Sequence, residues 1–433
     1  MIGFKGNHPN PKFVLLFGWL LSLSFFSLPP LIAQSSVKIQ SINAKNSTGY
    51  SNSINYNNRI RVGAERTWLY LPLIRGKKIA MVSNQTSTIG KTHLVDSLQK
   101  LGIDIRLVFA PEHGFRGDAE NGATVLNGMD AKTGLRIISL YGSNLKPLAS
   151  DLKEIDCVLF DIQDVGTRFY TYLTTLHYVM ESCAENKKQL IVLDRPNPNG
   201  YFIDGPVLNT EFRSMVGMHP IPIVHGMTLG ELASMINGEK WLPDLRHCPL
   251  TIIQCENYDH NKSYILPIPP SPNLPNQNAI YLYPTLCLLE GTQMSMGRGT
   301  AYPFECYGSP WLRKGSFLFV PQNIKGKALN PPFLNDTCHG VLLSDFANEF
   351  IVSFQHLYIE WLIMLYKECP DKNKFFNPFF LKLSGSDELK KQIMAGNSAE
   401  EIRKSWQSGI EKFSTDRKPY LLYPFDPTLG LKK

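Results

Sequence analysis

Polar side chains gather directly after five short apolar segments of this sequence of 433 residues. The groups contain acidic, basic and amide side chains, and they stand at residues 84–86, 111–114, 141–142, 161–164 and 194–197. Parallel strands end at a common edge of their sheet, and ligands bind in the crevice outside that edge. We therefore expect these five groups to meet at one site.

Glu112 is the residue of these groups that is best suited to acid–base chemistry. It follows the apolar run 107–110 and stands beside Pro111, so we expect its carboxyl group to be partly desolvated and to hold a proton as a general acid. The neighbouring His113 is a candidate to orient this carboxyl group or to contact a ligand. The alternative for Glu112 is a loop ion pair with Arg116.

Asp161 and Asp164 are candidates for a second carboxylate at the same edge. They stand three residues apart and precede Arg168, which offers an ion pair as the structural alternative. Asp164 is equally suited to cap the following helix, and Asp194 to brace a turn. The residue types favour carboxylate chemistry, and each structural alternative stays open.

The segments that position these residues alternate between strand-like and helix-like patterns. Helical spacing of apolar residues occurs at 92–101 and 170–186, and apolar runs typical of strands lie at 78–83, 105–110, 137–140, 157–160 and 190–193. This β-α-β rhythm predicts the α/β class, with a parallel sheet that helices cover on both faces.

The length of the chain predicts two folded domains, because 433 residues exceed what one hydrophobic core usually supports. A capped helix is expected at 228–237, and five prolines then crowd the segment 267–275. Short strands mixed with helices follow. We place the boundary near residue 240, with a first domain over 67–240 and a smaller α+β domain over 241–433.

The first 33 residues have the pattern of a secretory signal. Lys5 and Lys12 precede the apolar stretch 13–26, and the small residue Ala33 marks the expected cleavage point. Residues 34–66 are rich in Ser and Asn and are expected to form a flexible leader. The apolar stretch is short for a membrane span and no later segment is a better candidate. The sequence thus predicts an exported protein, periplasmic or released, without a stable membrane span.

The composition excludes several classes of protein. A hydrophobic content of 43% and a charged content of 19% are ordinary globular values, which exclude a disordered, collagenous or polytopic membrane chain. Removal of the first 33 residues takes away two lysines and lowers the formal net charge from +7 to +5, a mild basicity that suits an anionic polymer without requiring one. Cys157, Cys183 and Cys287 fall in apolar patterns and are expected to be buried thiols, whereas Cys248 and Cys255 could pair in an oxidising compartment.

The signatures of bound cofactors are incomplete. Residues 90–92 resemble the end of a phosphate-binding loop, but Gln85 stands where the loop requires glycine, and there is no Gly-x-Gly-x-x-Gly fingerprint. The histidines form no close ligand pair with acids or cysteines. We expect neither a cofactor nor a metal.

Longer motifs around the same residues resemble one family, the exo-acting β-N-acetylmuramidases of the NamZ type. The motif Ala-Pro-Glu-His-Gly-Phe-Arg-Gly at 110–117 is the most specific, and the others lie at 82–86, 160–166, 193–198, 289–292 and 297–300. The resemblance runs in the same order from about residue 68 to the C-terminus.

The resemblance implies a Rossmann-like domain joined to a smaller C-terminal domain, with the active-site cleft between them and no dinucleotide. It implies a glycoside hydrolase that releases N-acetylmuramic acid from the non-reducing end of peptidoglycan-derived glycans. The expected partners are peptidoglycan fragments and muramyl glycans, not nucleic acid, and the oligomeric state stays open.

A glycosidase needs one carboxyl group to protonate the leaving oxygen and a second to act as nucleophile or to activate water. Glu112 is the expected acid. For the second role Asp161 or Asp164 ranks before Glu290, and the acetamido group of the substrate is an alternative nucleophile. The remaining candidates bind the lactyl carboxylate, stack on sugars or line the site: Arg168, Arg195 and Arg298; Tyr170, Tyr172 and Tyr302; Asn84, His113, Asp194, Asn197, His225, Asn273 and Glu305.

Two other functions compete with this interpretation. A non-catalytic protein that binds muramyl saccharides would keep the arginines and tyrosines, but it would not need a pair of carboxyl groups. An esterase or amidase would need an activated serine or cysteine, and the sequence contains no Gly-x-Ser-x-Gly elbow.

Overall fold

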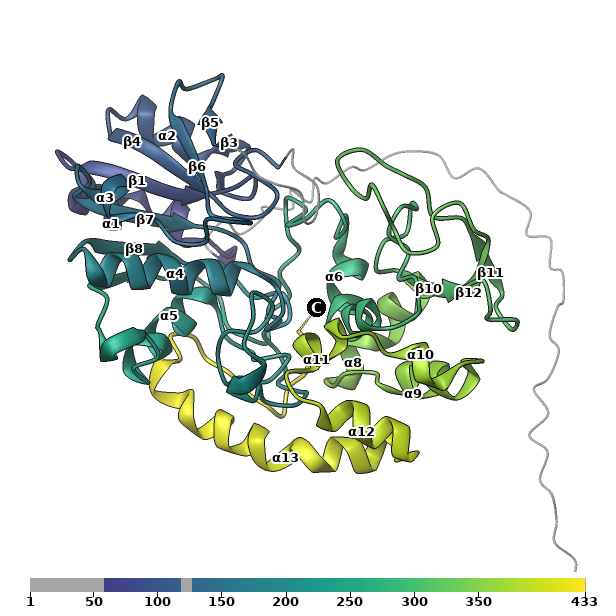
Figure 1. Cartoon of the computed structure of the whole chain (residues 1–433). Helices are drawn as coiled ribbons and strands as arrows, with labels where there is room; N and C mark the ends of the chain where they lie inside the picture. Colours follow the sequence, from purple (N-terminus) through teal and green to yellow (C-terminus); the bar gives the residue numbers. More distant parts are fainter. Residues whose placement is uncertain (1–57, 118–126, 433) are drawn as a thin grey trace, which may run out of the picture. The chain divides into compact units, whose positions relative to one another are not determined.

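The computed structural model describes residues 58–117 and 127–432 (Figure 1). The predicted signal segment and the leader up to residue 57 lie outside these residues. The last residues of the predicted leader are already packed: Arg61 pairs with Glu256 in a β-bridge, and Val62 and Ala64 are buried. Gly63 is pressed against the sheet, since a Cβ there would lie 2.3 Å from the carbonyl oxygen of Ile253.

A seven-stranded sheet organises the residues up to 253, which are called the sheet part below. The strand order is β5-β6-β4-β1-β7-β8-β9. Every neighbouring pair is parallel except β5 and β6. The strands are β1 (Lys78–Ser83), β4 (Asp104–Ala110), β5 (Gly128–Met129), β6 (Arg136–Ser139), β7 (Cys157–Asp161), β8 (Gln189–Leu193) and β9 (Leu250–Ile253), and a small hairpin joins β2 (Thr88–Ile89) to β3 (Thr92–His93).

Alternate residues of the strands enter two different cores. Ile79 and Met81 of β1 pack with the helices of one face, whereas Ala80 and Val82 pack with those of the other. Burial on both faces requires a continuous apolar run, as the sequence has here. The predicted α/β class is confirmed. One face carries α1 (Thr67–Ile74) and α2 (Leu94–Lys100), and the other carries α3 (Ala149–Leu152), α4 (Tyr172–Glu185) and α5 (Leu229–Gly238).

The smaller C-terminal part, residues 277–432, combines helices with a three-stranded antiparallel sheet of order β10-β12-β11. A connecting segment, residues 254–276, precedes it. The strands are β10 (Cys306–Ser309), β11 (Phe317–Phe319) and β12 (Cys338–Leu342). The helices are α6 (Gln277–Leu286), α7 (Ser344–Phe346), α8 (Val352–Phe354), α9 (Glu360–Glu368), α10 (Lys372–Phe375), α11 (Phe379–Ser384), α12 (Glu388–Ala395) and α13 (Ala399–Asp416), with a 3-10 turn at Cys287–Gly291.

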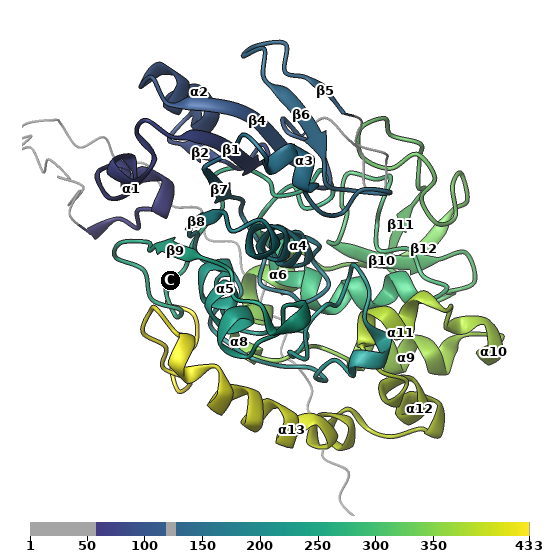
Figure 2. The same ribbon diagram turned by 60° about the vertical axis from the view of Figure 1, so that its left-hand side comes forward.

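The end of the chain returns to the sheet part. Helix α13 runs along the side of the molecule that carries α5 and α12 (Figure 2). Beyond it, the hydroxyl of Tyr423 donates to Asp194 at 2.7 Å, and the backbone N–H of Leu422 donates to Glu231 at 2.8 Å. All the residues that the structure describes belong to one compact unit. A boundary near residue 240 therefore stays a prediction.

All eight cysteines are buried free thiols. This confirms the expectation for Cys157, Cys183 and Cys287, but a bridge between Cys248 and Cys255 is not formed. The Cys255 thiol instead contacts the carbonyl oxygen of Asp194 at 3.2 Å. Within the residues that the structure describes, no helix is both long and apolar enough to cross a membrane.

Candidate active site

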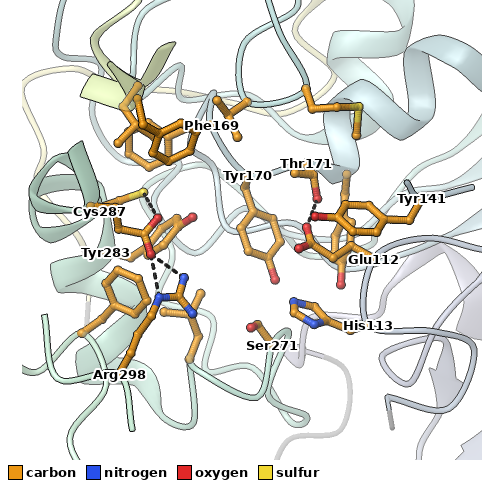
Figure 3. Close-up of a pocket in the computed structure, with 18 of the residues that line it drawn as sticks. Glu112, His113, Tyr141, Phe169, Tyr170, Thr171, Ser271, Tyr283, Cys287 and Arg298 are labelled. Carbon is orange, nitrogen blue, oxygen red and sulfur yellow. Dashed lines mark hydrogen bonds and ion pairs between the residues drawn. The ribbon is translucent and has the colours of Figure 1, made fainter. Parts of the chain in front are cut away.

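A cavity of about 490 Å³ opens between the sheet part and the C-terminal part (Figure 3). The loops after the strands contribute its polar side near β4, and the 3-10 turn after α6 contributes the opposite side. The principal lining residues are Glu112, His113, Tyr141, Phe169, Tyr170, Thr171, Ser271, Tyr283, Cys287, Glu290, Arg298 and Phe304. The cavity therefore brings together Glu112, His113, Tyr170, Tyr172, Glu290 and Arg298 from the predicted set, whereas Tyr302 does not line it.

A tight turn after β4 presents Glu112 to this cavity. The N–H of Gly114 donates to the carbonyl oxygen of Pro111 at 3.1 Å, and the chain reverses at His113 and Gly114, which have φ values of 72° and 79°. Such positive φ values are uncommon for a residue other than glycine and recur at functional sites. Glu112 and His113 stand at the tip of the turn.

The carboxyl group of Glu112 is largely shielded from solvent, since only 7% of the residue is exposed. The hydroxyl of Thr171 donates to its Oε2 at 2.8 Å. Burial, followed by the charge of Glu112 and the hydrogen bond to it, raises the pKa of Tyr141 above its ordinary value. The expected alternative is wrong, because Arg116 forms its ion pairs with Asp130 at 2.6 Å and with Asp96 at 3.1 Å.

Glu290 and Arg298 form an ion pair on the opposite side of the cavity. Nε of Arg298 donates to Oε1 of Glu290 at 2.6 Å, and Nη2 lies 2.5 Å from the same oxygen as an ion pair. The guanidinium carbon lies 4.9 Å from the centre of the Phe304 ring. Burial lowers the pKa of Arg298, but the charge of Glu290 and the hydrogen bond to it, together with smaller effects of Tyr283 and Cys287, raise it above the ordinary value. Arg298 therefore presents a permanent cation to the cavity.

Close backbone contacts explain the glycines on both sides of this arginine. Gly297 and Gly299 have φ values of 80° and 78°, in the region that favours glycine. A Cβ at Gly297 would lie 2.3 Å from the carbonyl oxygen of Tyr302. The turn around Arg298 thus depends on both glycines.

Asp161 and Arg195 pair with each other below the site and do not line the cavity. Both carboxylate oxygens of Asp161 accept from Arg195, at 2.6 and 2.9 Å, and Asp161 is 0% exposed. Arg168 was the expected ion-pair partner of this aspartate, but its guanidinium donates to four backbone carbonyl groups, those of Pro206, Ile221, Leu383 and Ser384. Asp161, Arg168 and Arg195 therefore belong to the frame that supports the site.

Asp164 is buried beside the frame and also lies outside the cavity lining. Its Oδ1 accepts the N–H of Gly166 at 2.7 Å, so it caps a turn and not helix α4. Its Oδ2 makes no hydrogen bond with the described residues. Burial raises the pKa of Asp164 to about 7.

This pKa predicts a pH-dependent stability. Between about pH 4 and pH 7 the folded state holds a proton on Asp164 that the unfolded state releases, so the free energy of unfolding should fall by about 1.4 kcal/mol per pH unit from this group. The contribution of Asp164 to the free energy of unfolding is fully present below its pKa in the unfolded state. It is lost as the pH rises through its pKa in the folded state. Asp164→Asn should flatten the dependence, measured by urea unfolding from pH 5 to pH 8. Parallel curves for the two proteins would rule this out.

The remaining predicted residues brace loops and do not line the cavity. Asp194 accepts from Thr228, Gly230 and Tyr423, and burial raises its pKa to about 6. The others bond their own loops or neighbouring segments: Asn84 with Thr86, Asn197 with Met227 and Asn199, His225 with Met227, Asn273 with Lys327, and Glu305 with Asn276 and Ser344.

The sequence did not indicate several residues of the lining. Thr171 holds Glu112, yet a threonine at the start of a helix is ordinarily interpreted as a cap. Ser271 lies in the proline-rich segment, and Phe169, Tyr283 and Phe304 stand in apolar patterns typical of a core. Among the described residues, no group of three His, Cys, Asp or Glu side chains could hold a metal ion.

Comparisons with known proteins agree with this arrangement of two parts. The family model of the N-terminal part of the exo-β-N-acetylmuramidase NamZ matches residues 79–278, and the model of its C-terminal part matches residues 281–423. The peptidoglycan β-N-acetylmuramidase NamZ of Bacillus subtilis (strain 168) is 38% identical over 375 residues, which cover 82% of this chain and 89% of that protein.

Two solved structures of DUF1343 family proteins from Bacteroides fragilis NCTC 9343 are also similar. One has a TM-score of 0.80 at 47% identity, and the other has a TM-score of 0.69 at 28% identity. Each match covers 85% of this chain and 100% of the other. On the strength of the sequence identity and of the two matching models, this chain belongs to the NamZ family of exo-β-N-acetylmuramidases.

Proposed function

We propose that this chain is a glycoside hydrolase that releases N-acetylmuramic acid from the non-reducing end of peptidoglycan-derived glycans. The observation that carries the proposal is the composition of the cavity wall. The desolvated carboxyl group of Glu112 lies on one side of the cavity, and the Glu290–Arg298 ion pair lies on the opposite side. The membership of the chain in the NamZ family supports a muramyl substrate.

Glu112 is the general acid of this proposal. The group that protonates a glycosidic oxygen must reach it and must be shielded from water, and Glu112 stands at the tip of a turn in the cavity wall with little exposure. Thr171 fixes one of its oxygens. Thr171 and Tyr141 thus hold the carboxyl group in place at the cavity wall.

Arg298 is the group that recognises the lactyl carboxylate of the sugar. Its Nε donates to Glu290 and its Nη2 lies against the same carboxylate oxygen, whereas Nη1 makes no hydrogen bond with the residues that the structure describes. A guanidinium group binds carboxylates through charge-assisted hydrogen bonds. Glu290 is the second carboxylate that lines the cavity, whereas Asp161 and Asp164 do not line it. We therefore assign to Glu290 one of two roles: it is the second catalytic carboxylate, or it positions Arg298.

The test of the function is the release of free N-acetylmuramic acid from a muramyl-terminated disaccharide, identified by mass spectrometry. Release of p-nitrophenol from p-nitrophenyl β-N-acetylmuramide should exceed release from the matching N-acetylglucosaminide. Folded protein that binds the disaccharide without cleaving it would instead support the saccharide-binding alternative.

Arg298→Lys should reduce the preference of the enzyme for the p-nitrophenyl muramide over the glucosaminide. The variant keeps the charge but loses the planar fork, so kcat/KM for the muramide should fall by roughly tenfold to a hundredfold, as expected for charged hydrogen bonds of about 1.5–3 kcal/mol. The glucosaminide lacks the lactyl group, and its kcat/KM should change little. Arg403→Lys is the control, because Arg403 pairs with Glu360 at 2.7 Å outside the cavity lining. Equal losses on both substrates would refute the role of Arg298.

A further inference from the structure

The hydroxyl group of Tyr170 is buried at the cavity; it interacts with the hydroxyl of Tyr172 but forms no hydrogen bond of good geometry with any described residue. It points into the middle of the cavity, between the side that holds Glu112 and His113 and the side that holds Arg298 (Figure 3). An unpaired buried hydroxyl is costly for the folded protein and calls for an explanation. A ligand oxygen that accepts its hydrogen bond would supply one.

The ring of Tyr170 is too closely packed to stack on a sugar ring. Its ring meets the rings of Tyr172 and Tyr283 edge to face, at centroid distances of 4.8 and 5.8 Å, and only 7% of the residue is exposed. Its N–H donates to the carbonyl oxygen of Thr167 at 3.0 Å. Burial raises the pKa of Tyr170 well above its ordinary value, so the hydroxyl keeps its proton.

The order of substituents on the sugar indicates which of them lies next to the hydroxyl of Tyr170. In N-acetylmuramic acid, carbons 1, 2 and 3 carry the scissile oxygen, the acetamido group and the lactyl ether, in that order. The proposed function places Glu112 at carbon 1 and Arg298 at the lactyl group. Tyr170 lies between these two side chains (Figure 3), and therefore faces carbon 2.

We infer that Tyr170 recognises the 2-acetamido group of the terminal sugar by donating a hydrogen bond to its carbonyl oxygen. The inference rests on the proposed function and adds to it the residue that selects N-acetylated sugars. It also gives the buried hydroxyl its missing acceptor, which the sugar brings into the cavity.

Tyr170→Phe tests this assignment through binding. Isothermal titration calorimetry of N-acetylmuramic acid and of muramic acid, which lacks the acetyl group, compares the two proteins without requiring turnover. Loss of one hydrogen bond should weaken N-acetylmuramic acid about tenfold. Muramic acid should bind both proteins alike. Unchanged affinity for N-acetylmuramic acid, or equal weakening of both ligands, would overturn the inference.

The kinetic signature of Tyr170→Phe differs from that of Arg298→Lys. Both p-nitrophenyl substrates carry the acetamido group, so kcat/KM should fall by a similar factor, about tenfold or more, for the muramide and for the glucosaminide. A loss confined to the muramide would place Tyr170 at the lactyl group and contradict the assignment.

Tyr70→Phe is the matched control, because its buried hydroxyl donates to the carbonyl oxygen of Ala64 at 2.8 Å outside the cavity lining. This control should keep full activity and unfold at a lower temperature. Tyr170→Phe should lower the unfolding temperature less than Tyr70→Phe does, since the hydroxyl of Tyr170 forms no hydrogen bond of good geometry. A wild-type protein that neither binds nor cleaves muramides would refute the proposed function, whereas an active wild type with an unaffected Tyr170→Phe would refute the inference alone.

Discussion

Glu112→Gln is expected to lower kcat on a muramyl-terminated disaccharide by roughly 10²- to 10⁴-fold, the range that a positioned general acid contributes. The amide keeps an oxygen that accepts from Thr171, so the turn after β4 should be preserved. What the variant loses is the proton that the departing sugar oxygen needs. Substrate affinity should change much less than turnover.

The leaving group provides the decisive comparison. A p-nitrophenolate departs readily without a proton, so Glu112→Gln should lose much less activity on the p-nitrophenyl muramide than on the disaccharide. Glu154→Gln is the control, because Glu154 is exposed and pairs with Lys78 outside the cavity lining. An equal loss on both substrates would show that Glu112 is not the acid.

Asp161→Leu should lower the free energy of unfolding by about 3–5 kcal/mol, the cost of leaving one member of a buried ion pair without its partner. The guanidinium group of Arg195 would stay buried with one remaining acceptor, the carbonyl oxygen of Thr88 at 3.1 Å. Urea unfolding followed by circular dichroism measures the loss.

The double variant Asp161→Leu with Arg195→Met separates support of the fold from catalysis. Replacing both charges by apolar side chains removes the unpaired cation, so most of the stability should return. The recovered protein should also regain activity, because the pair lies outside the cavity lining. A stable double variant that stays inactive would restore Asp161 as a catalytic carboxylate.

The strands of the central sheet could be predicted from the sequence because their burial is two-sided. Residues 78–83 and 157–160 are almost continuously apolar, and the structure forms β1 at Lys78–Ser83 and β7 at Cys157–Asp161. A parallel sheet covered on both faces leaves no position for a polar side chain within such a run. The end of each run therefore marks the edge at which polar residues begin.

The place of Glu112 in the site was predictable for the same reason and from its motif. It follows β4 directly, and the structure brings it to the cavity with His113. Asp161 ends β7, and Asp194 and Arg195 follow β8, yet the structure turns all three side chains into the protein. Successive side chains leave a strand in opposite directions, so a position at the edge does not say whether a side chain faces the ligand or the interior.

Partners from distant parts of the chain decided that direction. Arg195 turns Asp161 inward across 34 residues of sequence, Tyr423 closes over Asp194 across 229, and the carbonyl group of Leu383 receives Arg168 across 215. No local pattern reports such contacts. The sequence by itself determined the sheet, the family and the place of Glu112 after β4. Only the tertiary structure decided which charged groups face the cavity, because that choice depends on where remote segments supply a hydrogen-bonding partner.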